Sequence, residues 1–86
     1  MAEERIGEVI HYWSKIGVAG LRITQGELRV GDTIHIKGHT SDFTQPVESI
    51  QIESESVEVA GPGQDIGMKV IESARDHDEV FKVTPD

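Results

Sequence analysis

The clearest pattern in the chain is a double run of alternating apolar and polar residues within residues 28–38, LRVGDTIHIKG. Apolar residues alternate before Gly31, and Ile34 and Ile36 continue the alternation after Asp32. Gly31 can adopt the backbone angles that a tight turn needs, and Asp32 can hydrogen-bond the chain just ahead of it. Side chains alternate between the two faces of a strand, so Ile34 and Ile36 point to one face. The pattern predicts two short strands joined by a turn, with the rest of the chain adding further sheet.

The same criteria predict more short strands, separated by polar or glycine-rich turns. They are residues 6–13, 16–24, 45–53, 57–60, 66–70 and 80–83. In residues 45–53 the alternation slips, so we expect a bulge near residues 48–49 that returns the apolar side chains to one face. Residues 70–81 could instead form a helix, but the run Asp-His-Asp is a weak helix interior, which favours strand–loop–strand.

Short strands at this spacing predict an all-β fold, a small barrel, and one domain over residues 6–83. Residues 1–5 and 84–86 are expected to be tails. A chain of 86 residues is long enough for one hydrophobic core. The expected interior residues are Ile34, Ile36, Ile50, Ile52, Ile66 and Met68, with residues 80–83 helping to complete the barrel.

Composition narrows the cellular setting. The chain has no cysteine, so no disulfide is expected, and this fits a reducing cytoplasm. The first residues are acidic and lack an apolar run, which argues against a signal peptide. No apolar stretch approaches the length of a membrane span. We therefore expect a cytoplasmic protein that does not associate with membranes.

The charge balance is strongly acidic. There are 16 acidic residues against 8 basic ones, for a formal net charge of −8 at pH 7. Affinity for nucleic acid comes mainly from clustered lysine and arginine, so this surface disfavours RNA and DNA in bulk. The simplest interpretation is a solvated surface that keeps the domain soluble and its strand edges unpaired.

Residues with catalytic or metal-binding chemistry do not form a recognisable motif. The metal-capable side chains are His35, His39, Asp42 and His77, and their spacing is not diagnostic of any metal. Serine, histidine and aspartate are all present without a nucleophile elbow or triad context. The glycines at 61, 63 and 67 are interpreted as turn and packing residues, because no helix follows them to form a phosphate cradle. No enzyme activity, metal or cofactor is expected.

A binding role has more candidates, and one group of basic residues lies in or beside the best-defined strands. The candidate partner-binding residues are Arg22, Arg29, His35, Lys37, His39 and Phe43. The basic members could share a mildly basic face, or they could be an ordinary solvated strand face. Phe43 could be an exposed contact residue, or it could fold back to cover the end of the barrel.

Several of these residues carry a resemblance to a known family. They are residues 18–20, Gly26, Leu28, residues 30–32, Ile34, Ile36 and Gly38, followed by Val47, Ile50 and residues 60–67. In order and spacing they resemble the second domain of translational GTPases such as elongation factor Tu. Residues 16–43 are also similar to small stand-alone translation elongation factor-like proteins and to the C-terminal barrel of collagenase-like peptidases. The resemblance implies a six-stranded antiparallel Greek-key barrel.

The resemblance also implies a function. The chain lacks the GxxxxGK[ST] phosphate loop and a guanine-reading motif, so we expect no nucleotide binding. The acidic residue with which elongation factor Tu helps hold aminoacyl-tRNA corresponds to the region of Gln51, which is not a carboxylate. The favoured interpretation is a non-enzymatic module that contacts a protein or ribonucleoprotein of the translation apparatus, with protein favoured over RNA. The alternatives are an accessory barrel subunit of a separately encoded peptidase-like enzyme and a structural domain that oligomerises through strand edges.

Overall fold

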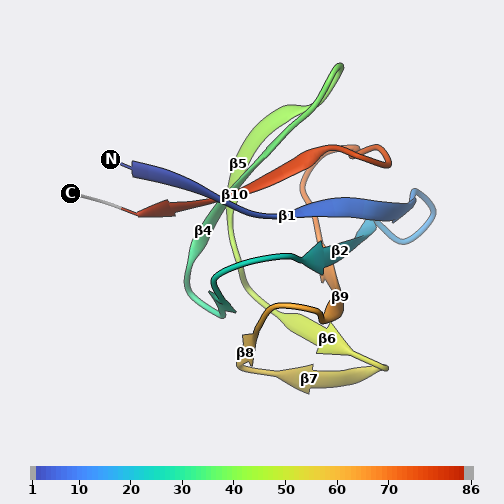
Figure 1. Ribbon diagram of the computed structural model, residues 1–86. Coiled ribbons are helices and arrows are strands. Elements are labelled where there is room, and N and C mark those ends of the chain that lie inside the picture. The colour runs from blue at the N-terminus through green and yellow to red at the C-terminus, as the bar shows by residue number, and fades with distance from the viewer. Residues whose placement is uncertain (1, 85–86) are drawn as a thin grey trace.

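The computed structural model describes residues 2–84, which form an all-β molecule with ten strands and no helix in that range (Figure 1). The strands are β1 (Ala2–Trp13), β2 (Val18–Ile23), β3 (Leu28–Arg29), β4 (Thr33–Lys37), β5 (Asp42–Pro46), β6 (Ile50–Ile52), β7 (Glu55–Val57), β8 (Val59–Ala60), β9 (Asp65–Lys69) and β10 (Glu79–Thr84). Each strand pairing is antiparallel. The predicted all-β class is confirmed, and residues 70–78 form the loop that the sequence favours over a helix.

The sheet rolls into a barrel because one stretch of chain pairs at both of its sides. Eight strands hydrogen-bond in the order β5-β4-β10-β1-β2-β9-β6-β7, and β3 and β8 form a separate two-stranded ribbon. β5 and β6 stand far apart in this order, yet only residues 47–49 separate them along the chain. The stretch from β5 to β6 therefore pairs at both sides of the sheet, because its β5 part pairs with β4 and its β6 part pairs with β9. Figure 1 shows the long curved path of this stretch.

The predicted number of six strands is wrong. The irregular segment at residues 47–49 divides one bent strand into β5 and β6, at the place where the slipped alternation predicts a bulge. The run at residues 57–60 is likewise divided, between the end of β7 and β8. The strands also do not follow sequence order, since β10 lies between β1 and β4. Such crossing connections are typical of Greek-key arrangements.

The turn between β3 and β4 forms as the sequence predicts. Gly31 has a φ of 101°, which an L side chain rarely tolerates. The main-chain N–H of Arg29 donates to the Asp32 carboxylate at 2.8 Å. Two main-chain hydrogen bonds then fasten the turn to the bent strand, because Gly31 donates to the Val47 carbonyl at 2.9 Å and Val47 donates to the Asp32 carbonyl at 2.7 Å.

A buried glutamine links β5 to the end of β9, where the two backbones do not pair directly. The Gln45 side-chain amide donates to the carbonyl of Lys69 at 2.9 Å, and its oxygen accepts the N–H of Ile71 at 2.8 Å. Gln45 is only 5% exposed. Its side chain therefore supplies the hydrogen bonds that a neighbouring strand would otherwise provide, and it satisfies two backbone groups at the barrel wall.

Branched aliphatic side chains fill the interior. The largest of the fully buried ones are Ile6, Leu21, Ile23, Leu28, Ile34, Ile36, Ile50, Val9, Val47 and Val80. The predicted core is confirmed, except that Ile52 is only partly buried while it packs against the core. Val80 and Val83 of β10 are buried, as expected for a strand that completes the barrel.

The first strand is longer than the sequence pattern predicts. β1 begins at Ala2, and its first residues pair with β10, where Ala2 lies opposite Thr84. The tail expected at residues 1–5 is therefore strand from Ala2 onward, and Thr84 belongs to β10. Met1 and residues 85–86 lie outside the described residues. Within residues 2–84 there is no helix with the length and hydrophobicity to span a membrane.

Candidate protein-binding groove

The β1–β2 hairpin carries two exposed apolar side chains, Trp13 and Ile16. The main-chain N–H groups of Ile16 and Gly17 both donate to the carbonyl of Trp13, at 3.3 and 2.9 Å. Gly17 has a φ of 65°, a left-handed conformation that suits glycine. This turn holds Ile16 near the tip of the hairpin with 62% of its surface exposed, and Trp13 at the end of β1 is 46% exposed.

Both side chains line an open groove of about 390 Å³. Its apolar lining is supplied by Ile10, Trp13, Ile16, Val18 and Ile66, with Gly20 and Gly67 between them. These residues come from the hairpin and from β9, which Figure 1 shows beside β2 and above β6. The volume lies within the range of roughly 300–1,000 Å³ that is usual for clefts that hold ligands.

Two glycines keep this groove hollow. Gly20 of β2 lies directly opposite Gly67 of β9 in the antiparallel ladder, so two neighbouring positions on the sheet carry no side chain. A Cβ at Gly20 would lie 3.2 Å from the Trp13 ring. The indole therefore packs against the backbone of Gly20, and a larger residue there would push it outward.

The charged residues along the groove are both acidic. Glu53 follows β6, and Asp65 begins β9. Asp65 is paired with Arg22, whose Nε and Nη2 donate to the two carboxylate oxygens at 2.9 and 3.3 Å. Those hydrogen bonds hold the pKa of the Asp65 carboxyl below its usual range and raise the pKa of the Arg22 guanidinium.

The basic residues predicted from the sequence do not gather on one face. Arg22 on β2 is engaged by Asp65, and Arg29 on β3 lies 2.9 Å from a carboxylate oxygen of Glu27. Neither β2 nor β3 pairs with β4, which carries His35 and Lys37. The structure thus separates Arg22 and Arg29 from the other members of the predicted basic group.

His35 is held between two carboxylates on the outside of the barrel. Its Nδ1 lies 3.0 Å from a Glu3 oxygen, and its Nε2 lies 2.5 Å from an Asp42 oxygen. Two hydrogen bonds raise the pKa of His35 above its ordinary value. The bond to Asp42 has the larger effect and the bond to Glu3 the smaller one. The ring also stands 6.1 Å from the Phe81 ring. His35 is therefore committed to contacts within the barrel wall.

Phe43 is a core residue. It is 6% exposed and belongs to the same hydrophobic cluster as the isoleucines of β4. Of the two possibilities that the sequence leaves open, Phe43 takes the one in which it folds back into the barrel, because a buried aromatic ring gains more free energy than an exposed one. Phe43 is therefore not exposed at the tip where a partner would contact it directly.

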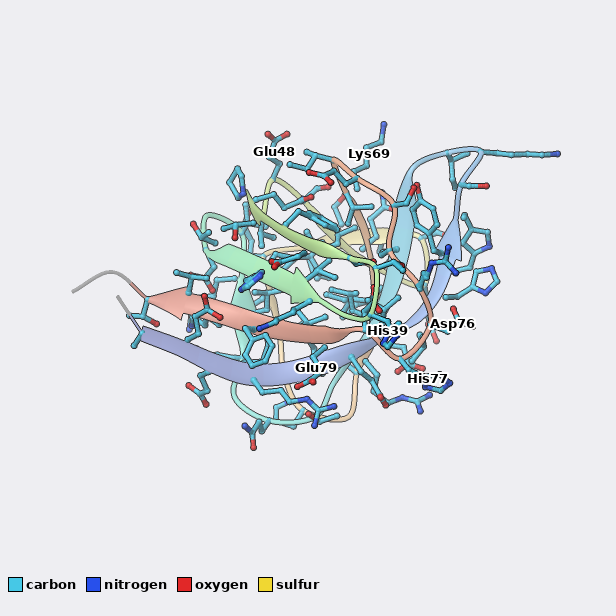
Figure 2. All side chains as sticks on the ribbon, turned by 90° about the horizontal axis from the view of Figure 1, so that it is seen from above. His39, Glu48, Lys69, Asp76, His77 and Glu79 are labelled. Atoms are coloured by element: carbon cyan, nitrogen blue, oxygen red, sulfur yellow. The ribbon has the colours of Figure 1, made fainter. Side chains whose placement is uncertain are left out.

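Lys37 and His39 lie together at a second, more polar depression of about 490 Å³. Its other charged or titratable lining residues are Asp76, His77, Asp78 and Glu79. Figure 2 shows His39, Asp76 and His77 near one another at one end of the molecule, with Glu48 and Lys69 elsewhere on the surface. Within residues 2–84, no three histidine, cysteine, aspartate or glutamate side chains are grouped so that they could hold a metal ion.

Sequence reasoning does not locate the groove. Neighbouring positions on a strand face opposite sides of the sheet. This alternation predicts that one of Tyr12 and Trp13 lies in the core and the other at the surface. In the structure Tyr12 packs against the core. The isolated Ile16 after the turn at residues 14–15 is the one sequence signal that points to the exposed patch. The pairing of Gly20 with Gly67 depends on tertiary structure and leaves no local pattern.

Sequence comparison relates this chain to part of larger peptidases. No family model matches it. A collagenase of Porphyromonas gingivalis is 41% identical over 78 residues, which make up 90% of this chain and 22% of the collagenase. An uncharacterized protease of Methanocaldococcus jannaschii is 35% identical over 77 residues, covering 88% of this chain and 19% of the protease. The chain thus spans about a fifth of the length of the curated relatives it matches.

Comparison with solved structures also relates this chain to peptidases. The C-terminal domain of a Geobacillus thermoleovorans protein assigned to the U32 peptidases superimposes with a TM-score of 0.87 and 26% identity, over 94% of this chain and 93% of that domain. The selenomethionine form of that domain gives a TM-score of 0.84. These matches support the peptidase part of the predicted resemblance, whereas its translation-factor part has no support among them. In sequence and in fold, this chain is similar to the C-terminal β-domain of U32 peptidases.

Proposed function

We propose that this chain is a non-catalytic accessory barrel that binds the catalytic polypeptide of a U32-type peptidase, supplied by a separate chain. The observation that carries this proposal is the similarity of this chain to a β-domain of peptidases. The collagenase match covers 90% of this chain and 22% of the relative. A domain of the same fold has been solved as the C-terminal portion of a U32 peptidase.

The features of the groove agree with a protein partner. Exposed aromatic and aliphatic side chains are enriched at the centres of protein interfaces. Trp13 and Ile16 provide both kinds beside an apolar hollow. The net charge of −8 gives no electrostatic reason for binding RNA, since affinity for nucleic acid rests largely on contacts between basic side chains and phosphates. The cytoplasmic location expected from the lack of cysteine remains a prediction.

Co-expression tests the proposal. The tagged chain would be produced together with the catalytic portion of a U32 peptidase encoded by the same host, and the purified material would be examined by size-exclusion chromatography with light scattering. We expect a stoichiometric complex that survives moderate salt, because an interface built on apolar contacts is screened weakly by ions.

Affinity purification from the native host can contradict the proposal. If the chain fails to bind the catalytic polypeptide and instead enriches ribosomal proteins or tRNA, the peptidase proposal is wrong and the translation reading replaces it. Peptidase assays with the separate catalytic portion, with and without this chain, then show whether the barrel changes turnover or only partner stability.

A further inference from the structure

The turn that borders the groove is built from residues that do not favour its conformation. Glu53 and Ser54 form the two-residue connection between β6 and β7, and both have positive φ, 50° and 69°. Two-residue hairpin turns with positive φ at both positions strongly favour Asn-Gly or Gly-Gly. Outside glycine and asparagine this conformation is strained, and such strain is commonly retained at functional sites. Both residues line the groove.

Glu53 also gives the groove an uncompensated negative charge. The other groove carboxylate, Asp65, already has Arg22 as its partner. Among the ion pairs of the described residues, none involves Glu53, whose side chain is exposed. An apolar hollow next to an unneutralised carboxylate is complementary to a segment that carries a large apolar side chain with a lysine or arginine nearby.

From the strained turn, the apolar hollow and the unneutralised carboxylate, we infer that the groove binds an apolar segment of the peptidase catalytic polypeptide whose basic side chain pairs with Glu53. This inference rests on the proposed function and adds the surface and the chemistry of its partner. A second copy of this chain is a poor occupant, because each copy carries a net charge of −8 and the two would repel each other.

Stability and binding should respond in opposite directions to one substitution. Replacing the strained turn by Asn-Gly, with the double variant Glu53→Asn, Ser54→Gly, should raise the melting temperature because the new residues favour positive φ. It should also weaken binding to the recombinant catalytic portion about tenfold. A loss of affinity in a protein with a higher melting temperature cannot be attributed to unfolding.

A matched pair of isoleucines tests the apolar part. Ile16→Ser should weaken binding by about tenfold or more, as expected for an anchor at an interface centre. Ile71→Ser is the control, because Ile71 is 66% exposed, similar to Ile16 at 62%, but lines a different depression. The control should bind within about twofold of the wild type. Equal losses in the two variants would show that general surface hydrophobicity drives the association, and would overturn the inference.

The tryptophan reports occupancy directly. The chain has one tryptophan, so 5-fluorotryptophan labelling places a single fluorine resonance in the groove. Adding the unlabelled catalytic portion should shift this resonance and reduce its sensitivity to exchange of H₂O for D₂O, because the ring becomes covered. A complex that forms with the resonance and its solvent sensitivity unchanged contradicts the groove assignment but leaves the proposed function standing.

Two other outcomes have separate meanings. If no complex forms with the wild-type chain, the proposed function is wrong, and the inference that rests on it is wrong as well. If the resonance changes with the concentration of this chain alone, and sedimentation shows a dimer, the groove is a self-association surface and the inference is overturned.

Discussion

At the scale of single residues, Gly7 marks the point where β1 passes from one partner strand to another. It lies opposite Val80 of β10 and also opposite Ile23 of β2. A Cβ at this position would collide with the carbonyl oxygen of Arg22, which is main chain and cannot rotate away. Only glycine allows β1 to approach β2 this closely.

We therefore expect Gly7→Ala to destabilise the fold by about 2–3 kcal/mol, as for other substitutions that overpack a rigid site. Urea unfolding monitored by circular dichroism measures this free energy. Gly67→Ala is the control, because its added Cβ would meet the Val18 side chain at an ordinary distance of 3.7 Å. Equal midpoints for the two variants would mean that β1 shifts to accommodate the methyl group.

Ile36 tests the face assigned to the best-defined strand. It is fully buried, so Ile36→Ala removes apolar contacts and leaves a cavity. The expected loss of unfolding free energy is about 2–4 kcal/mol. Lys37→Ala, at the exposed neighbouring position, should change that free energy by less than about 0.5 kcal/mol. An unchanged unfolding midpoint for Ile36→Ala would contradict the burial of this face.

At the scale of elements, the Gln45 side chain joins β5 to the chain that follows β9. Gln45→Leu keeps a similar volume but leaves the carbonyl of Lys69 and the N–H of Ile71 without these partners. Unsatisfied buried polar groups of this kind cost about 1–3 kcal/mol each. Hydrogen exchange of the Ile71 amide should accelerate more than exchange in the β1–β10 ladder. Uniform acceleration throughout the barrel would show a global effect with no local opening.

His35 connects three strands through its two carboxylate partners, Glu3 on β1 and Asp42 on β5. Because its folded pKa is raised, the protonated form is favoured by folding. The resulting stabilisation is fully present below the unfolded pKa of about 6.5 and is lost as the pH rises through the folded value. The unfolding free energy of the wild type should therefore decline over that window.

A His35→Gln variant provides the comparison. Glutamine can still hydrogen-bond a carboxylate but does not titrate, so the difference in unfolding free energy between the two proteins should shrink as the pH rises above 6.5. NMR titration of the His35 ring gives the folded pKa directly. A ring that titrates at or below the ordinary histidine value would contradict the ion pairs.

Periodicity reveals which elements exist, but not how they meet. The alternation at Ile34 and Ile36 is sufficient to predict their burial, because a strand has only two faces. The strand at residues 2–5 has no such signal, since it consists mostly of charged residues and is held by pairing with β10. The contact of His35 with Glu3 spans 32 positions in sequence. Such pairings arise from topology, and so does the groove floor formed by Gly20 and Gly67.

At the scale of the whole molecule, a hydrophobic core is enclosed by a surface that carries an apolar groove and a more polar depression. The core is continuous from strand to strand, and most basic side chains that the sequence offered as a binding face are either paired or dispersed. The recognition surface that we propose is the groove beside a hairpin and a strained turn. Apolar anchors in such a groove would gain affinity from desolvation, which charge patterning alone does not predict.

The pairing of Ala2 with Thr84 at the start of the β1–β10 ladder has a mechanical consequence. The beginning of β1 and the end of β10 lie side by side in Figure 1. Tension applied between these two points would pull the strands apart across their hydrogen bonds, which run perpendicular to antiparallel strands. The bonds would then break one after another, as in a zipper, and would not share the load. Under such a load the β1–β10 ladder would therefore open sequentially from this corner.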